Sequence, residues 1–127
     1  MVHLKKSVVE VKAVENFLAH AIIIAIAKVE NESDYKAYRQ GRKIRPVAQK
    51  LLPETDLDVS EGGGISELVK LQENFRQFSI TVYQGLACQD IIYEGLVDFT
   101  KKINLLYDDV EQQYNVIVNI TGAMAKK

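Results

Sequence analysis

The sequence predicts an α+β domain in which helices come first and a small antiparallel sheet follows. Apolar residues cover every side of a helix-length segment at residues 16–29, apart from His20, which is typical of a helix in the centre of a domain. From Phe78 onward, apolar residues recur at every second position, and the turns are too short for crossover helices. A length of 127 residues fits one domain, residues 1–127, with its own core.

Two further helices are expected after the central one, at residues 33–52 and 65–76. The first of them is interrupted by Gly41 and Pro46, so it forms either two short helices or one kinked helix. Asn16 is the expected N-cap of the central helix, with its side-chain oxygen accepting a first-turn amide. Residues 53–64 are acidic and rich in turn formers, which predicts an exposed loop.

The β-rich runs predict three or four antiparallel strands, because each is rich in β-branched and aromatic residues and is bounded by turn formers. These runs lie at residues 78–83, 90–94, 103–107 and 114–120. Residues 1–13 have no clear assignment beyond a short strand at residues 8–11.

The composition is that of an ordinary globular protein. The 16 Lys plus Arg almost balance the 17 Asp plus Glu, which implies neither disorder nor a polyanion-binding tail. The longest apolar stretch, residues 21–27, is well short of the roughly 18 to 20 residues of a membrane span. The single cysteine, Cys88, has no internal partner, and no secretory signal pattern is present. An intracellular protein, cytoplasmic or nuclear, is expected.

Candidates for catalysis are few. A thiol nucleophile would be Cys88, with only His3 and His20 as possible bases. His20 is better interpreted as a core or boundary residue and Cys88 as a small buried apolar side chain. One cysteine and two distant histidines cannot form a closed zinc site, so neither metal nor cofactor is expected. Turn residues, and not metal ligands, are expected at Asp108, Asp109 and Glu111.

Basic residues recur near helical spacing in the second helical segment. They are Lys36, Arg39, Arg42, Lys43, Arg45 and Lys50. Such a set can contact nucleic-acid phosphates independently of sequence. A solvated helix surface is the alternative interpretation of the same pattern.

Four blocks of the sequence, covering nearly everything from Phe17 onward, carry a family resemblance. They read FLAHAIIIAIAKVENESDYKAYRQGRKIRPVAQKLL, GGGISELVKLQENF, ITVYQGL and INLLYDDVEQQYNVIVNITGAMAKK. In order and spacing they resemble the N-terminal region of Polinton, or Maverick, transposon family-B DNA polymerases. The resemblance implies a cysteine-peptidase domain of the OTU-like, papain-like kind.

The resemblance also implies where a catalytic site would lie, and that it has been lost. The family's nucleophile, at the start of the central helix, falls on Phe17. Its base falls on Gln113, and the residue that would orient the base falls on Asn115. Without a thiol and an imidazole at these positions, acyl-transfer catalysis is not expected.

A catalytically inactive peptidase-like domain that binds a protein is therefore the leading hypothesis, with a ubiquitin-like partner implied by the OTU resemblance. The contact residues would be Phe17, Gln113, Tyr114 and Asn115. One alternative is a nucleic-acid accessory module that uses the basic helical segment. Another is a structural domain that forms a homo-oligomer through apolar residues or an unpaired strand.

Overall fold

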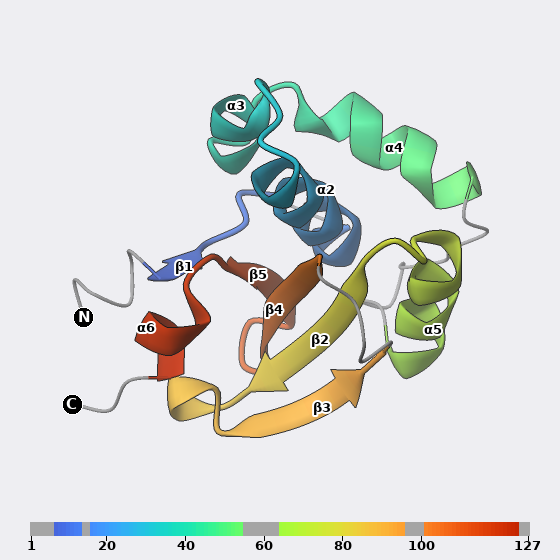
Figure 1. Ribbon diagram of the computed structural model, residues 1–127. Helices are drawn as coiled ribbons and strands as arrows, with labels where there is room; N and C mark the ends of the chain where they lie inside the picture. Colours follow the sequence, from blue (N-terminus) through green and yellow to red (C-terminus); the bar gives the residue numbers. More distant parts are fainter. Residues whose placement is uncertain (1–6, 14–15, 55–63, 96–100, 125–127) are drawn as a thin grey trace.

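The computed structural model describes residues 7–13, 16–54, 64–95 and 101–124, and it has the expected α+β architecture (Figure 1). The helices are α2 (Phe17–Val29), α3 (Tyr35–Arg39), α4 (Ile44–Glu54), α5 (Ile65–Asn74) and α6 (Ile120–Met124). The strands are β1 (Val8–Val9), β2 (Ser79–Gln84), β3 (Asp90–Glu94), β4 (Lys102–Asp108) and β5 (Gln113–Ile117), and a 3-10 turn, η1, spans Leu86–Cys88.

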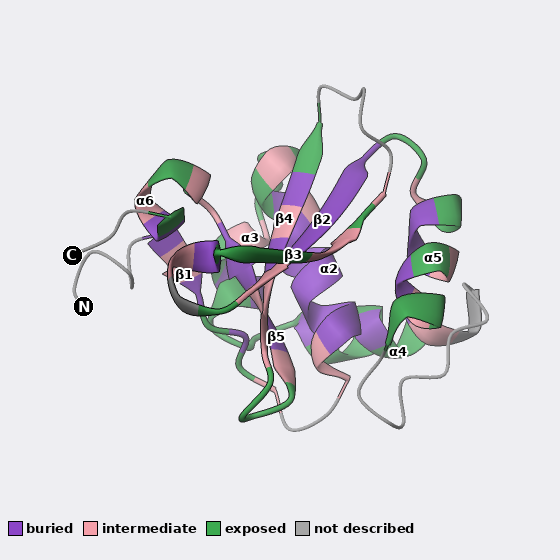
Figure 2. Ribbon diagram, turned by 90° about the horizontal axis from the view of Figure 1, so that it is seen from below, coloured by how far each residue is buried: buried purple, intermediate pink, exposed green. Residues whose placement is uncertain are grey.

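Helix α2 is the middle of three layers, as its all-round apolar sequence predicts. It packs against β4 and β5 on one side and against α3 and α4 on the other (Figure 1). Leu18, Ile22 and Ile24 are almost completely buried, and purple runs along most of the helix in Figure 2. None of the helices in the described part of the chain is long and apolar enough to span a membrane.

The sheet is mixed, with the strand order β1-β5-β4-β2-β3, so the expectation of an antiparallel sheet was wrong at one pair. Strands β2 and β4 run parallel, with Ile80 opposite Ile103 and Val82 opposite Leu105. The reason is the position of β3, which folds back antiparallel to β2 at the edge. It returns the chain to the end of the sheet where β2 begins, so β4 starts there and runs in the direction of β2. Strand β3 therefore lies in the connection between the parallel strands, where a crossover helix usually lies.

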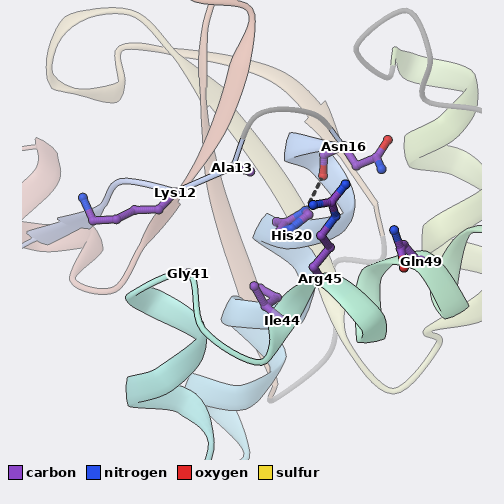
Figure 3. Close-up of a pocket in the computed structure, with 8 residues that line it drawn as sticks. All are labelled: Lys12, Ala13, Asn16, His20, Gly41, Ile44, Arg45 and Gln49. Atoms are coloured by element: carbon purple, nitrogen blue, oxygen red, sulfur yellow. Dashed lines mark hydrogen bonds between the residues drawn. The ribbon is translucent and has the colours of Figure 1, made fainter.

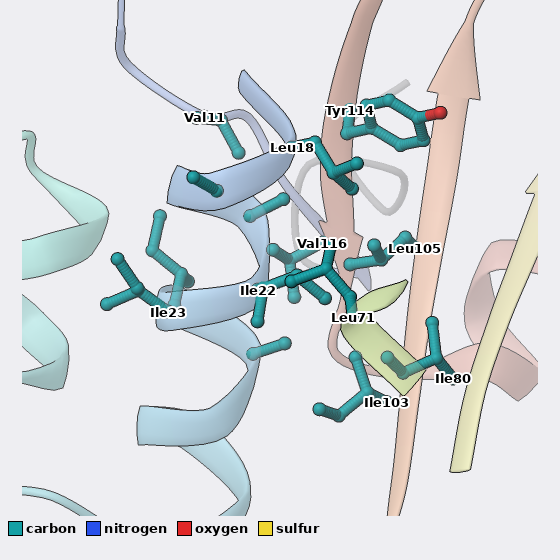
Figure 4. Close-up of a cluster of buried hydrophobic side chains, with 14 of the residues drawn as sticks. Val11, Leu18, Ile22, Ile23, Leu71, Ile80, Ile103, Leu105, Tyr114 and Val116 are labelled. Carbon is teal, nitrogen blue, oxygen red and sulfur yellow. The ribbon is translucent and has the colours of Figure 1, made fainter. Parts of the chain in front are cut away.

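The main core fills the space between α2 and the sheet (Figure 4). It contains Leu18 and Ile22 from α2, Leu71 from α5, and Ile80 and Leu105 from the strands, each at most 1 % exposed. Burying one such side chain contributes about 1.5 to 3 kcal/mol. A smaller cluster on the opposite face of the sheet contains Cys88, Ile117 and Ala123.

The helical segment at residues 33–52 forms two helices, the first of the two predicted alternatives. The break lies at Gly41, whose φ of 81° suits a residue without a side chain, and Lys43 also has a positive φ of 67°. Pro46 lies in the first turn of α4, where the missing N–H costs no helical hydrogen bond. Asn16 is the N-cap of α2, but the expected side-chain bond was wrong. Its backbone is left-handed, with φ of 59°, and its side chain makes no capping bond.

The remaining boundaries differ from the predictions in smaller ways. The strand expected at residues 8–11 covers only Val8–Val9, where it pairs with β5. The run at 114–120 ends as a strand at Ile117, and helix α6, which the sequence did not predict, follows. Residues 55–63, most of the predicted loop, lie outside the described residues.

A buried glutamine joins α5 to the sheet. The Gln72 side-chain amide donates to the Phe78 carbonyl at 2.7 Å, and its oxygen accepts from the Ile80 amide at 2.9 Å. These backbone groups lie where the chain enters β2 and have no access to water. Gln72 therefore satisfies polar groups that would otherwise be buried without partners.

We predict that Gln72→Leu lowers the free energy of unfolding by about 2 to 4 kcal/mol, because an unsatisfied buried backbone group costs about 1 to 3 kcal/mol. Urea denaturation measures the change. The matched control is Gln77→Leu, the same substitution at an exposed turn position. Equal stability of the two variants would contradict a structural role for the Gln72 amide.

Candidate functional site

The structure places the positions expected for a lost peptidase site on two packed elements but not on one face. Tyr114 and Val116 of β5 belong to the core under α2, so the alternating positions Gln113 and Asn115 lie on the opposite face of that strand, with Ile117. Phe17 is the first residue of α2, while Gln113 and Asn115 lie on β5, the strand that packs against α2. Phe17 and Gln113 are half-buried. Phenylalanine, glutamine and asparagine supply no thiolate and no imidazole, so these three side chains cannot perform nucleophilic catalysis of the cysteine-peptidase kind.

Asn115 has a structural task at this place. Its Oδ1 accepts a hydrogen bond from the Val11 amide at 3.0 Å and a second from Gln113 Nε2 at 2.9 Å. The first bond ties the segment after β1 to β5. The second holds Gln113 against Asn115, as the spacing of two along a strand allows. The side-chain oxygen of Asn115 therefore accepts its hydrogen bonds from within the protein.

Tyr114 is a core residue and not a contact surface. It is 2 % exposed, and its ring lies 5.0 Å from that of Tyr107 at an angle of 50°. Burial, with smaller contributions from Tyr107 and Glu67, raises the pKa of Tyr114 to about 12. Of the contact residues expected from the resemblance, Phe17 and Gln113 therefore have side-chain surface that a partner can contact, and Tyr114 does not.

The other candidate groups for catalysis lie apart. Cys88 is 3 % exposed in the small cluster on the far face of the sheet, and burial raises the pKa of its thiol. His20 is a buried polar residue of α2, 6 % exposed, and its Nδ1 lies 2.9 Å from the Asn16 carbonyl oxygen. His3 lies outside the described residues. Among the residues that the structure describes, no group of His, Cys, Asp and Glu could hold a metal ion.

The acidic residues between β4 and β5 are turn residues, as predicted. Asp108 Oδ1 accepts from the Val110 amide at 3.0 Å and from the Glu111 amide at 3.1 Å. This is the usual way in which an aspartate stabilises a turn two and three residues ahead.

The basic residues of the second helical segment are all exposed, and the structure divides them into two groups. Lys36 and Arg39 line a hollow of about 460 Å³ together with Lys12. Arg45 lines a second hollow, of about 210 Å³, that Lys12 also borders. Lys50 lies on another side of α4, beside the apolar residues Ile22 and Ile26 of α2. We call the exposed cations that line these two hollows, namely Lys12, Lys36, Arg39 and Arg45, the basic face.

Several of these cations are held in place. The Arg39 guanidinium lies 5.8 Å from the centre of the Tyr35 ring. Lys28, a further cation at the end of α2, has its Nζ 5.5 Å from the same ring centre. Arg42 donates to Gln40 Oε1 at 2.8 Å. Lys43 is partly neutralised, because its Nζ lies 3.5 Å from Asp34 Oδ1. Within the described ranges, Lys36, Arg39 and Arg45 form no ion pair.

The 210 Å³ hollow is the site that sequence reasoning missed (Figure 3). It is lined from the segment before α2, the first turn of α2, the α3–α4 turn and the start of α4 by Lys12, Ala13, Asn16, His20, Gly41, Ile44, Arg45 and Gln49. No periodic pattern joins these four segments. The one available signal was His20, the single polar interruption of the apolar helix.

Comparison with protein-family models, with curated proteins and with solved structures found no match to this chain.

The raised pKa of Tyr114 predicts a loss of stability in alkali. The folded pKa of about 12 lies above the ordinary value of 10.0, so the stabilisation is complete below pH 10 and is lost as the pH rises toward 12. A shift of this size corresponds to about 2 to 3 kcal/mol. Denaturation of the wild type and of Tyr114→Phe at neutral and alkaline pH measures it.

The Phe variant should lose about 2 to 3 kcal/mol less than the wild type between neutral pH and pH 12, whatever its stability at neutral pH. Tyr35→Phe, at a half-buried position in the outer layer, is the control. Parallel alkaline losses in the wild type and Tyr114→Phe would contradict the burial of this phenol.

Proposed function

We propose that the chain is a non-catalytic binding module whose basic face holds the phosphate backbone of a nucleic acid without reading its sequence. The observation that carries this proposal is the gathering of Lys12, Lys36, Arg39 and Arg45 around two neighbouring hollows. These cations come from separate segments, and all are exposed. Binding of nucleic acid through such a surface is electrostatic and depends steeply on salt.

The local charge differs from that of the whole chain. The formal net charge is −1, which gives no general attraction to polyanions. Among the described residues that line the two hollows, however, Glu10 is the one acidic residue. At ordinary salt, charges more than about 10 Å apart are largely screened from each other. A phosphate that reaches this surface therefore interacts mainly with the local excess of cations.

Changing Lys36 and Arg39 together to Gln tests the proposal. We expect the double variant to bind a duplex oligonucleotide more weakly than the wild type. Its slope of log affinity against log salt should be shallower by about 2, since each lost phosphate contact removes about 0.9. Fluorescence anisotropy of a labelled duplex over a range of salt concentrations measures both quantities.

The matched control is the double variant Lys50→Gln and Lys102→Gln. It removes the same net charge from exposed positions outside the basic face. Its salt slope should equal that of the wild type. An equal loss in both double variants would mean that only overall charge matters, and an undetectable complex at low salt would refute nucleic-acid binding.

A second candidate function is the binding of a protein, with a ubiquitin-like partner at the start of α2. Phe17 supports it, because this aromatic side chain is only partly buried at the first residue of an otherwise buried helix. Exposed aromatic residues often anchor protein interfaces. The family resemblance supports the same end of the domain, as a peptidase-like cleft that has lost its chemistry.

A titration with ubiquitin, followed by the amide chemical shifts of labelled protein, checks this candidate. We expect saturable shifts at Phe17 and Gln113, and Phe17→Ala should weaken binding about tenfold or more, as loss of an anchor residue does. Phe75→Ala, a half-buried position away from the start of α2, is the control. Without shifts at high ubiquitin concentration, this partner is excluded.

Self-association through a strand has less support from the sheet. Its edges are β1, with two residues, and β3, whose register with β2 shifts between Val82 and Tyr83. A short strand and a bulge both hinder pairing with another chain. Asp90 and Glu94 are exposed at the two ends of β3, where Figure 2 shows green, so a second antiparallel copy would bring like charges together.

A further inference from the structure

The hollow at the start of α2 has the features of a built polar site. His20 lines the hollow, although the residue is only 6 % exposed. Such burial is unusual for a side chain whose ring nitrogens need hydrogen-bond partners. Its Nδ1 is occupied by the Asn16 carbonyl at 2.9 Å. Its Nε2 has no hydrogen-bond partner in the described part of the chain, and yet it is not sealed from the hollow.

A cation and an amide stand opposite this ring. Figure 3 shows the Arg45 side chain extending from the start of α4 toward the His20 ring and the Asn16 carbonyl, with Gln49 one turn further along the helix. Arg45 makes no ion pair with any described carboxylate. The Lys12 ammonium points away from His20 in the same view.

Two helices also begin at this hollow. Asn16 is the N-cap of α2, and Ile44 and Arg45 are the first residues of α4. Helix starts carry unpaired amides and the positive end of the helix dipole, so both favour a negative group nearby. With the Arg45 guanidinium, they define a hollow that is suited to an anion.

The ring restricts the anion further. When the ring is neutral and donates Nδ1–H to the Asn16 carbonyl, Nε2 is an acceptor, and a ligand that pairs with it brings a donor as well as negative oxygens. A phosphate group that retains one proton meets both needs, because its O–H donates to Nε2 while its charged oxygens accept from the guanidinium. A volume of about 210 Å³ is below the roughly 300 Å³ of ordinary ligand pockets, which favours a small group.

We propose that the hollow formed by Asn16, His20, Arg45 and Gln49 binds a phosphate monoester or free phosphate. Two sources supply the same chemistry, namely a small phosphorylated molecule and the 5′-terminal phosphate of a nucleic-acid strand. The second source rests on the proposed nucleic-acid binding, and the first does not.

The first arm of the test is a titration of labelled protein with inorganic phosphate at about pH 7.5, where a free imidazole is mostly neutral and inorganic phosphate still carries a proton. We expect saturable shifts of the His20 ring nitrogens and of the Gly41 and Arg45 amides. Sulfate, which carries no proton at this pH, should bind at least about fivefold more weakly, because it has no donor for Nε2.

Arg45→Gln should weaken phosphate binding about tenfold, the usual effect of losing a charge-assisted hydrogen bond. Arg45 is exposed, so this variant should fold, and the amide spectrum without phosphate verifies that. Lys50→Gln removes the same charge from another side of the same helix and should bind phosphate within about twofold of the wild type. His20→Gln provides a second variant, with loss of the preference for phosphate over sulfate as its readout.

The second arm compares one oligonucleotide with and without a 5′-phosphate. Tighter binding of the phosphorylated strand, abolished by Arg45→Gln alone, supports a strand end as the ligand. Phosphate binding at the hollow without this difference supports a small molecule as the ligand. Shifts spread over all lysines, equal binding of sulfate, or equal loss in Arg45→Gln and Lys50→Gln would overturn the phosphate site. Oligonucleotide binding through Lys36 and Arg39 would still stand in that case.

Discussion

The rest of the structure depends on the burial of α2 between two layers. A helix of 13 residues with apolar side chains on every face is stable only if both sides are covered. The sheet covers one side through β4 and β5, and α3 and α4 cover the other. Since the helix cannot expose any face, the polar residues that it carries lie at its first turns and at its end. The start of α2 is therefore where this core reaches the surface.

The parts of the fold that depend on local pattern were predictable from the sequence. The all-round apolar composition of α2 and the alternation from Phe78 to Val82 identify the central helix and the central strand. The parallel pairing of β2 with β4 was not predictable, because it depends on β3 folding to the outer edge. Alternation of side chains is the same in parallel and antiparallel strands. Helix α6 was missed because its five residues carry little helical pattern and include Gly122.

The candidate site was predictable only in part, for a similar reason. The family resemblance predicts a site at Phe17, Gln113 and Asn115, and the structure places Phe17 on α2 and the other two on the face of β5 away from that helix. It could not show that Asn115 binds the Val11 amide, because 104 residues separate the partners. The hollow beside His20 could not be predicted from the sequence for the same reason, since its lining comes from four separate segments. A single polar residue in an apolar helix indicates an unusual environment but not the residues that surround it.

The two sides of the start of α2 now have different properties. On the sheet side, the side chains of β5 bond within the domain, as Asn115 does with Gln113 at 2.9 Å. On the helical side, Nε2 of His20 has no hydrogen-bond partner among the described residues, and the charged side chain of Arg45 lines the same hollow. A helix start favours a thiolate and a phosphate for one physical reason, which is its unpaired amides and positive dipole. The start of α2 therefore has an electrostatic preference for a negative group although Phe17 supplies no thiol, and the adjoining basic face extends this preference.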